Sequence, residues 1–268
     1  MLSTALFVFS VQASTKAVAV RIGDTELTCF NWKPEAPTKE ARTLFVFHGT
    51  DRNAQEYGDH TIPLAAKVSC ALVAPLFDKE RFPNWRYHRG GIQDAKGNLQ
   101  ARIEWTYTIL EKLLAQTQGE NTLIGHSAGG QFLNRMCAFA GTSAKRVIVA
   151  NPGSVIFPRS DWSFPFGMGG LSPALSSEEA IKSYLAQPMT FLLGTADNKP
   201  DENFDTSKDA MRQGGGRLQR STNCFNYGKA LAQRNGWHFN WGLVQVPGIG
   251  HDHEKMFNSF EAIKAFER

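Results

Sequence analysis

Short apolar runs rich in β-branched residues recur along the chain, separated by polar or amphipathic stretches. Most runs are continuous and do not alternate with polar residues, which is typical of strands buried on both faces of a parallel sheet. They are residues 44–47, 71–76, 122–124, 147–150, 189–193 and 243–246. Two earlier runs, 17–22 and 27–32, predict an antiparallel hairpin at one edge of the same sheet.

Helical periodicity fills several of the intervals between these runs. Residues 177–186 predict a short helix. Two longer segments carry an apolar face, residues 99–118 through Ile103, Tyr107, Leu110 and Leu114, and residues 253–267 through Met256, Phe260 and Ile263. The alternation of strands and helices predicts an α/β fold with helices on both faces of the sheet.

Two stretches depart from this alternation. Residues 153–188 are rich in aromatic residues and glycine, and residues 198–221 are polar and glycine-rich. Long excursions in a compact domain are usually lids or binding loops, so 153–188 is predicted to be a lid or cap insertion. No linker separates either stretch, and residues 14–268 are expected to form a single domain.

Composition and charge narrow the class of protein. The chain has 268 residues, of which 42% are hydrophobic and 20% charged, as in soluble globular proteins. Its 29 basic and 25 acidic residues are mixed along the sequence, without a basic arm. This balance gives no electrostatic reason to expect a nucleic-acid partner.

The amino-terminal segment indicates export. The first fifteen residues carry no charge, residues 5–11 are apolar, and small residues stand at Val11 and Ala13. This pattern predicts a signal peptide over residues 1–13 and a secreted or periplasmic protein, although a buried first strand is the alternative. The apolar run is too short to span a bilayer, so no transmembrane anchor is expected.

The cysteines are Cys29, Cys70, Cys137 and Cys224, and their spacing matches no metal-binding pattern. No metal site is expected. For an exported protein one disulfide is compatible with the sequence, and buried free thiols are equally compatible.

The segment GHSAGG, residues 125–130, follows the apolar run that ends at Ile124 and precedes a helical pattern. Strand, tight turn and helix is the setting of a nucleophile elbow, in which glycines at 125 and 129 allow close backbone approach. Ser127 is therefore the predicted nucleophile. The alternative is an ordinary small residue at the start of a helix.

A serine nucleophile needs a base, and three histidines lie downstream. His251 stands in a glycine-rich loop between a strand and the last helix, from which an imidazole can reach over the sheet. His238 has aromatic neighbours, and His253 is expected to begin the last helix with Asp252 as its N-cap. His251 is the predicted base.

The imidazole needs a carboxylate to fix its tautomer. Asp197 directly follows the strand-like run 189–193 and is preferred over Asp201 and Asp205, which lie deeper in the polar excursion. The backbone amides of Thr50 and Ala128 are the predicted oxyanion donors. His48, before Thr50, is expected to be a buried structural histidine.

These residues stand in the order Ser, Asp, His. This order and four short motifs resemble those of the α/β-hydrolase superfamily. The motifs are HG at 48–49, GHSAGG at 125–130, GTAD at 194–197 and GIGH at 248–251. In layout the chain is similar to secreted bacterial esterases and polyester depolymerase-like hydrolases, and it lacks the HGGG string of the hormone-sensitive-lipase group. The resemblance implies an eight-stranded, mostly parallel sheet and no metal or organic cofactor.

The expected activity is cleavage of a carboxylic ester, in a small molecule or a polymer, through an acyl-enzyme. A serine peptidase or amidase on the same fold is the enzymatic alternative, and a non-catalytic binding module is the alternative of another class. Trp85, Trp162, Phe164 and Phe166 are candidate substrate-lining residues. Alternatively Trp85 lies in a solvated loop, and the other three pack a lid onto the domain.

Overall fold

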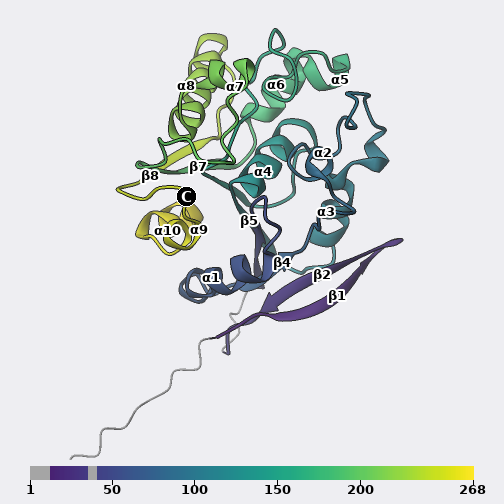
Figure 1. Cartoon of the computed structure of the whole chain (residues 1–268), viewed down its shortest axis with the longest axis vertical. Coiled ribbons are helices and arrows are strands. Elements are labelled where there is room, and N and C mark those ends of the chain that lie inside the picture. The colour runs from purple at the N-terminus through teal and green to yellow at the C-terminus, as the bar shows by residue number, and fades with distance from the viewer. Residues whose placement is uncertain (1–12, 36–40) are drawn as a thin grey trace, which may run out of the picture.

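Eight strands form one sheet in the order β1-β2-β4-β3-β5-β6-β7-β8 (Figure 1). The structure is a computed structural model and describes residues 13–35 and 41–268. The strands are β1 (Lys16–Ile22), β2 (Thr25–Trp32), β3 (Arg42–Phe47), β4 (Ala71–Pro75), β5 (Glu120–His126), β6 (Arg146–Ala150), β7 (Met189–Gly194) and β8 (Gly242–Val246). Each of the predicted apolar runs lies in one of them, except that the run 71–76 extends one residue beyond β4.

The sheet is parallel from β4 to β8 and antiparallel at one edge. β1 and β2 form the predicted hairpin, and β2 pairs antiparallel with β4. The remaining neighbours are parallel, so the carboxyl ends of β3, β5, β6, β7 and β8 share one edge of the sheet. Loops at that edge can bring distant residues together.

Helices cover both faces of the sheet. They are α1 (Ala54–Lys67), α2 (Asn84–Tyr87), η1 (Arg102–Glu104), α3 (Thr106–Leu114), α4 (Ala128–Phe139), α5 (Pro173–Ser176), α6 (Glu178–Leu185), α7 (Lys208–Gln213), α8 (Arg217–Asn235), α9 (His253–Phe257) and α10 (Phe260–Glu267). Residues of α3, α4, α6 and α8 belong to one apolar layer, and residues of α1, α9 and α10 to the other. Adjacent residues of β5 divide between the layers, with Leu123 in the first and Ile124 in the second.

Two predicted helices are shorter than their sequence patterns. The backbone of Trp105 is extended (φ −68°, ψ 142°), so the pattern from 99 divides into η1 and α3. Ile103 is consequently 67% exposed and does not join the apolar face. The pattern 253–267 divides at Ser259, which caps α10, and this leaves Phe260 65% exposed in the first turn.

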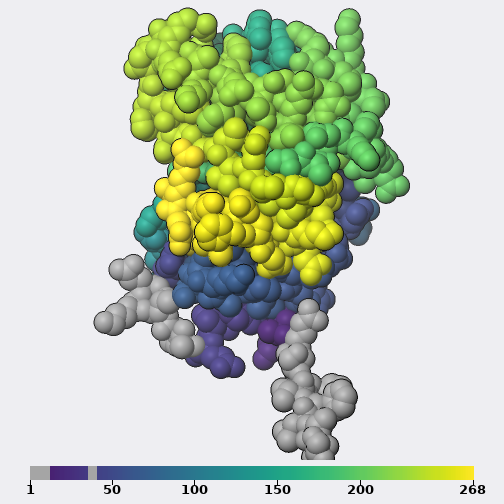
Figure 2. All heavy atoms as spheres, turned by 90° about the vertical axis from the view of Figure 1, so that its left-hand side faces the viewer, coloured from purple at the N-terminus to yellow at the C-terminus, as the bar shows by residue number. Residues whose placement is uncertain are grey.

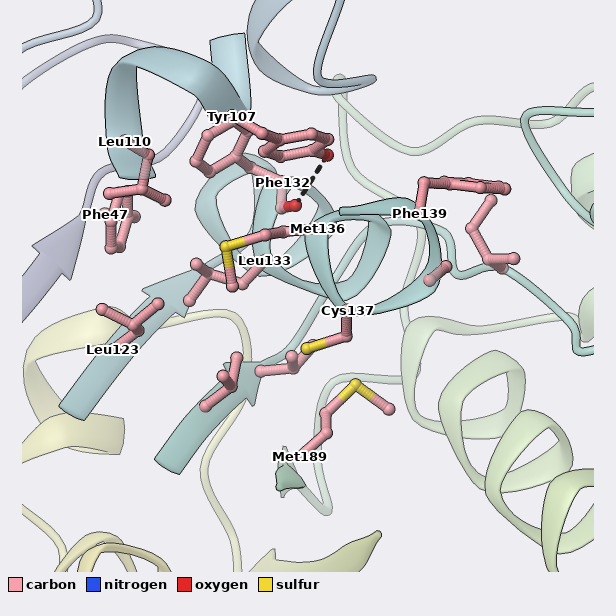
Figure 3. Close-up of a cluster of buried hydrophobic side chains, with 14 of the residues drawn as sticks. Phe47, Tyr107, Leu110, Leu123, Phe132, Leu133, Met136, Cys137, Phe139 and Met189 are labelled. Carbon is pink, nitrogen blue, oxygen red and sulfur yellow. Dashed lines mark hydrogen bonds between the residues drawn. The ribbon is translucent and has the colours of Figure 1, made fainter. Parts of the chain in front are cut away.

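Helix α4 is held by apolar contacts along most of its length. Figure 3 shows Phe132, Leu133, Met136 and Cys137 directed into the layer above β5. The hydroxyl of Tyr107 donates a hydrogen bond of 3.0 Å to the carbonyl oxygen of Phe132. This packing holds the amino end of α4, and with it Ser127, in a fixed position.

The four cysteines are buried and free, as one of the two sequence interpretations has it. Burial raises the pKa of the Cys29 and Cys70 thiols to about 11, so these thiols are protonated and unreactive at neutral pH. Among the described residues, no helix combines the length and hydropathy needed to cross a membrane. The predicted signal peptide lies almost wholly outside the described residues.

Candidate active site

Ser127 occupies a strained turn between β5 and α4. Its φ is 56° and its ψ is −115°, a region that residues with a β-carbon rarely adopt. Such a conformation costs about 1–3 kcal/mol and persists only where the surroundings impose it. The Ser127 amide donates to the carbonyl oxygen of Ala150 at 3.0 Å, which ties the turn to β6.

The glycines on either side of Ser127 permit this turn. A β-carbon at position 129 would collide with the carbonyl oxygen of Phe47, and one at position 125 would collide with the backbone of Gly129. Strands β3 and β5 and helix α4 can therefore approach at backbone distance only if both residues are glycine. This accounts for the Gly-x-Ser-x-Gly pattern on steric grounds.

His251 and Asp197 come together at the carboxyl ends of β8 and β7. His251 Nδ1 and Asp197 Oδ2 are 2.8 Å apart, and the Asp197 side chain is 2% exposed. The side-chain amide of Asn151 donates to the carbonyl oxygen of Gly250 at 3.0 Å and so fastens the His251 loop to the end of β6. The ring of His251 lies 4.4 Å from that of His126, the residue before Ser127.

Asp197 has a second neighbour that sequence reasoning missed. Arg217, at the start of α8, places Nη1 3.4 Å from Asp197 Oδ1 and also binds Asp201 with two hydrogen bonds of 2.7 Å. Its side chain is 2% exposed. Arg217 lies in the segment GGGRLQR, where the only sequence signal was a basic residue after glycines at a helix start.

Among the described residues, none of the other sequence candidates for base and acid pairs with His251 or Asp197. His238 is exposed in the segment before β8, and His253 begins α9 with Asp252 as its N-cap, as predicted. Asp201 is engaged by Arg217, which holds its pKa below the usual range. Asp205 is exposed and lies at the wall of the cavity that contains Ser127.

Thr50 and Ala128, the predicted oxyanion donors, line the same cavity as Ser127. The loop that carries Thr50 is anchored by His48, which is fully buried. The amide of Phe77 donates to His48 Nε2 at 3.1 Å, so the proton lies on Nδ1 and is donated to the carbonyl oxygen of Gly49 at 2.9 Å. Burial lowers the pKa of His48 to about 3, and the ring is neutral, as its structural role requires.

The cavity beside Ser127 has a volume of about 230 Å³ and a wall rich in arginine. Arg89, Arg135 and Arg217 line it, and only Arg217 pairs with a carboxylate among the described residues. Arg135 is 1% exposed, and its guanidinium donates to the Ser154 hydroxyl and the Pro165 carbonyl oxygen, both at 3.0 Å. Sequence reasoning missed this feature, because Arg135 falls on α4 two turns beyond Ser127.

The positive wall also acts on His88, which lines the cavity too. Burial lowers the pKa of His88 to about 3, and the charges of Arg52, Arg135 and Arg89 lower it further. His88 is therefore neutral at physiological pH, and the arginine charges around it favour an anionic group in the cavity over a cationic one.

Of the four aromatic residues predicted to line the substrate site, only one lines the cavity. Phe166 lines the cavity. Phe164 is 9% exposed and packs against Phe139, whereas Trp162 packs against Phe157 and does not line the cavity. Trp85 lies in α2 and is also outside the cavity lining. These neighbouring aromatic residues therefore pack against different partners, and sequence proximity did not reveal this.

The strand order and the turn at Ser127 define an α/β-hydrolase fold. A poly(3-hydroxybutyrate) depolymerase from Bordetella parapertussis is 31% identical, with a TM-score of 0.84 and coverage of 96% of this chain and 91% of the depolymerase. Poly(aspartic acid) hydrolase-1 from Sphingomonas sp. KT-1 is 28% identical, with a TM-score of 0.84 and coverage of 94% and 99%. The chain belongs to the α/β-hydrolase superfamily and is similar to its depolymerase-like hydrolases.

More distant structures share the fold alone. An S-formylglutathione hydrolase from Agrobacterium tumefaciens is 14% identical, with a TM-score of 0.55 and coverage of 94% of this chain and 92% of that one. Neither the protein-family models nor the curated proteins gave a match to this chain.

Proposed function

We propose that the protein is a serine hydrolase that cleaves carboxylic esters through an acyl-enzyme. The observation that carries the proposal is the pairing of His251 with Asp197 at 2.8 Å, at the same end of the sheet as the strained turn of Ser127. The ends of three strands would then contribute the nucleophile, the base and the orienting carboxylate, which are the three groups that the reaction needs.

In the proposed reaction, Ser127 Oγ attacks the ester carbonyl carbon while His251 Nε2 takes the hydroxyl proton. Asp197 accepts the Nδ1 proton in a hydrogen bond and stabilises the imidazolium that forms. The amides of Thr50 and Ala128 hold the oxyanion, and the imidazolium returns its proton to the leaving alcohol. His251 then takes a proton from a water molecule, which attacks the acyl carbon; the bond to Ser127 Oγ breaks, the carboxylic acid leaves, and Ser127 Oγ takes the proton back from the imidazolium.

The decisive experiment is Ser127→Ala assayed with short p-nitrophenyl esters and with a fluorophosphonate probe. Turnover is expected to fall by several powers of ten and labelling to vanish, while the circular dichroism spectrum is unchanged. Ser160→Ala is the matched control, because Ser160 is exposed and lies outside the cavity lining. If Ser127→Ala retains more than about a tenth of the turnover rate of the unaltered protein, the proposal is wrong.

A second candidate function is hydrolysis of amide bonds whose acyl group carries a carboxylate. The arginine-lined wall favours it, since Arg89 and Arg135 supply positive charge that no described carboxylate pairs. One of the similar structures, at 28% identity, is titled a poly(aspartic acid) hydrolase. An anionic acyl group would exchange its hydration for hydrogen bonds from these guanidinium groups.

Matched substrates separate the two functions. p-Nitrophenyl butyrate and the p-nitrophenyl monoester of succinic acid differ in a terminal methyl against a carboxylate, and the corresponding anilides test amide cleavage. A site that recognises a carboxylate is expected to hydrolyse the succinyl compounds faster than the butyryl compounds. Arg135→Met and Arg89→Met are each expected to reduce this preference by about tenfold, equivalent to about 1.4 kcal/mol. If the protein hydrolyses the two esters at equal rates, and Arg135→Met and Arg89→Met do not change these rates, the substrate does not carry a carboxylate that these arginines recognise.

We also propose export, with cleavage after Ala13. Ala13 and Ser14 are exposed. Thr15, the first buried residue of the described part of the chain, binds Asp59 through its amide and hydroxyl, both at 2.7 Å. Cleavage at this point would leave the contact with Asp59 intact. Intact-mass analysis of protein recovered from the periplasm or medium tests this, and a cytoplasmic product that retains Met1 contradicts it.

A further inference from the structure

A second cluster of ionisable side chains lies outside the active-site cavity. Glu56 and His60 are on α1, and His253 is the first residue of α9. His60 Nδ1 lies 3.0 Å from His253 Nε2, and Glu56 Oε1 lies 3.8 Å from the same Nε2. One possible ligand atom from each of these three residues lies within 4.8 Å of the other two.

The donor atoms suit a transition-metal ion. Glu56 and His60 are four residues apart and therefore share one face of α1. Two imidazoles and a carboxylate form a frequent donor set for Zn²⁺, with bonds of about 2.0–2.2 Å. Tetrahedral geometry with such bonds separates donor atoms by about 3.3 Å. The 3.0 Å and 3.8 Å spacings from His253 Nε2 to His60 Nδ1 and to Glu56 Oε1 lie on either side of this value.

Neighbouring residues hold two of these donors in orientation. The Tyr57 ring stacks on the His253 ring, with centroids 3.8 Å apart and an interplanar angle of 5°. Asn53 Nδ2 donates to Glu56 Oε2 at 2.8 Å, which leaves Oε1 directed toward His253. Contacts of this kind fix metal ligands in place and raise the affinity of a site.

We propose that Glu56, His60 and His253 together bind a divalent transition-metal ion such as Zn²⁺. Glu254, whose Oε2 is 3.7 Å from His60 Nδ1, adds a second carboxylate beside the site.

The ion would join two elements that are distant in sequence. Figure 2 shows α9 and α10, in yellow, against the blue of α1 on one face of the molecule, and α1 and α9 are in direct contact. His253 stands two residues after His251. Metal binding would therefore cross-link the first helix to the segment that follows the proposed base, and would stabilise the folded state.

The test uses tag-free, chelator-treated protein of the full chain. Calorimetric titration with Zn²⁺ is expected to show one ion per chain, and Co²⁺ to produce visible absorption bands of a protein-bound ion. Zn²⁺ is expected to raise the Tm of the unaltered protein. In His60→Gln both the binding and the rise in Tm should be lost, whereas His238→Gln, at an exposed histidine outside the cluster, should retain them.

Two further variants make the outcome decisive. Glu56→Gln should weaken Zn²⁺ binding while it preserves side-chain volume, and His251→Gln should leave binding unchanged because His251 is not a ligand. Absence of binding in the unaltered protein, full binding in His60→Gln, or loss of binding only in His251→Gln would each overturn the proposal. Ester turnover by Ser127 does not enter any of these readouts, so this proposal and the proposed function fail independently.

Discussion

Arg217 Nη1 lies 3.4 Å from Asp197 Oδ1, whereas His251 contacts the other carboxylate oxygen, Oδ2. The two side chains are each 2% exposed. The buried Asp197 carboxylate therefore contacts the His251 imidazole through one oxygen and the Arg217 guanidinium through the other. The same guanidinium binds Asp201. We therefore predict that Arg217 is a positioning residue, which acts on His251 through Asp197.

The first prediction follows from this contact. Arg217→Gln removes the charge that stabilises Asp197 and releases Asp201, so kcat should fall by about tenfold, or about 1.4 kcal/mol, with little change in KM. Arg217→Lys should recover part of the loss, because lysine keeps the charge and lacks the bidentate fork. Arg102→Gln, in an exposed pair with Glu111, is the control. Unchanged kcat in Arg217→Gln would show that Asp197 needs no support.

The second prediction separates two aromatic residues of the 153–188 segment. Phe166→Ala should change the preference for acyl chain length with little effect on Tm, because Phe166 lines the cavity. Phe164→Ala should cost about 3 kcal/mol of folding free energy and leave the preference unchanged, because Phe164 is buried against Phe139. Substrate profiles and urea denaturation of both variants measure this, and the reverse result would exchange the two roles.

The third prediction concerns the turn at Ser127. Gly129→Ala should destabilise the fold by about 3 kcal/mol or prevent folding, because its β-carbon would meet the carbonyl oxygens of Phe47 and His48, which are backbone atoms that cannot move aside. Gly215→Ala is the control, since a β-carbon there meets only the flexible end of Gln219. A Gly129→Ala protein with unaltered Tm would contradict the steric account of the elbow.

The fourth prediction concerns acid. Burial lowers the pKa of His48 and His88 to about 3, and lowers that of His126 well below its ordinary value. Between about pH 6.5 and these folded-state values, the unfolded chain binds protons that the folded chain does not. The free energy of unfolding should therefore fall as pH falls, by about 1.4 kcal/mol per pH unit for each of these histidines.

Urea denaturation at pH values between about 7 and 5 measures this slope. His48→Gln should reduce it by the contribution of one proton, and His238→Gln, at an exposed position, should leave it unchanged. A free energy of unfolding independent of pH over this range would show that the buried histidines accept protons without cost.

Much of the fold was predictable because its signals are local. A continuous apolar run such as 44–47 or 147–150 can be stable only where both faces are covered, so the parallel sheet followed from sequence. The helix breaks before Thr106 and Phe260 were not predictable. Apolar periodicity continues through both points, whereas extended backbone at Trp105 and Ser259 interrupts the helices.

The sequence by itself determined Ser127, Asp197 and His251 as candidates, since each directly follows a recognisable strand or stands in a glycine-rich loop after one. Parallel strands bring such positions to one edge, whatever the details of packing. Only the tertiary structure decided that Arg217 supports Asp197, that Arg135 lines the cavity, and that Glu56 and His60 meet His253. Such contacts join residues up to 193 positions apart, and they depend on side-chain directions that no local pattern records.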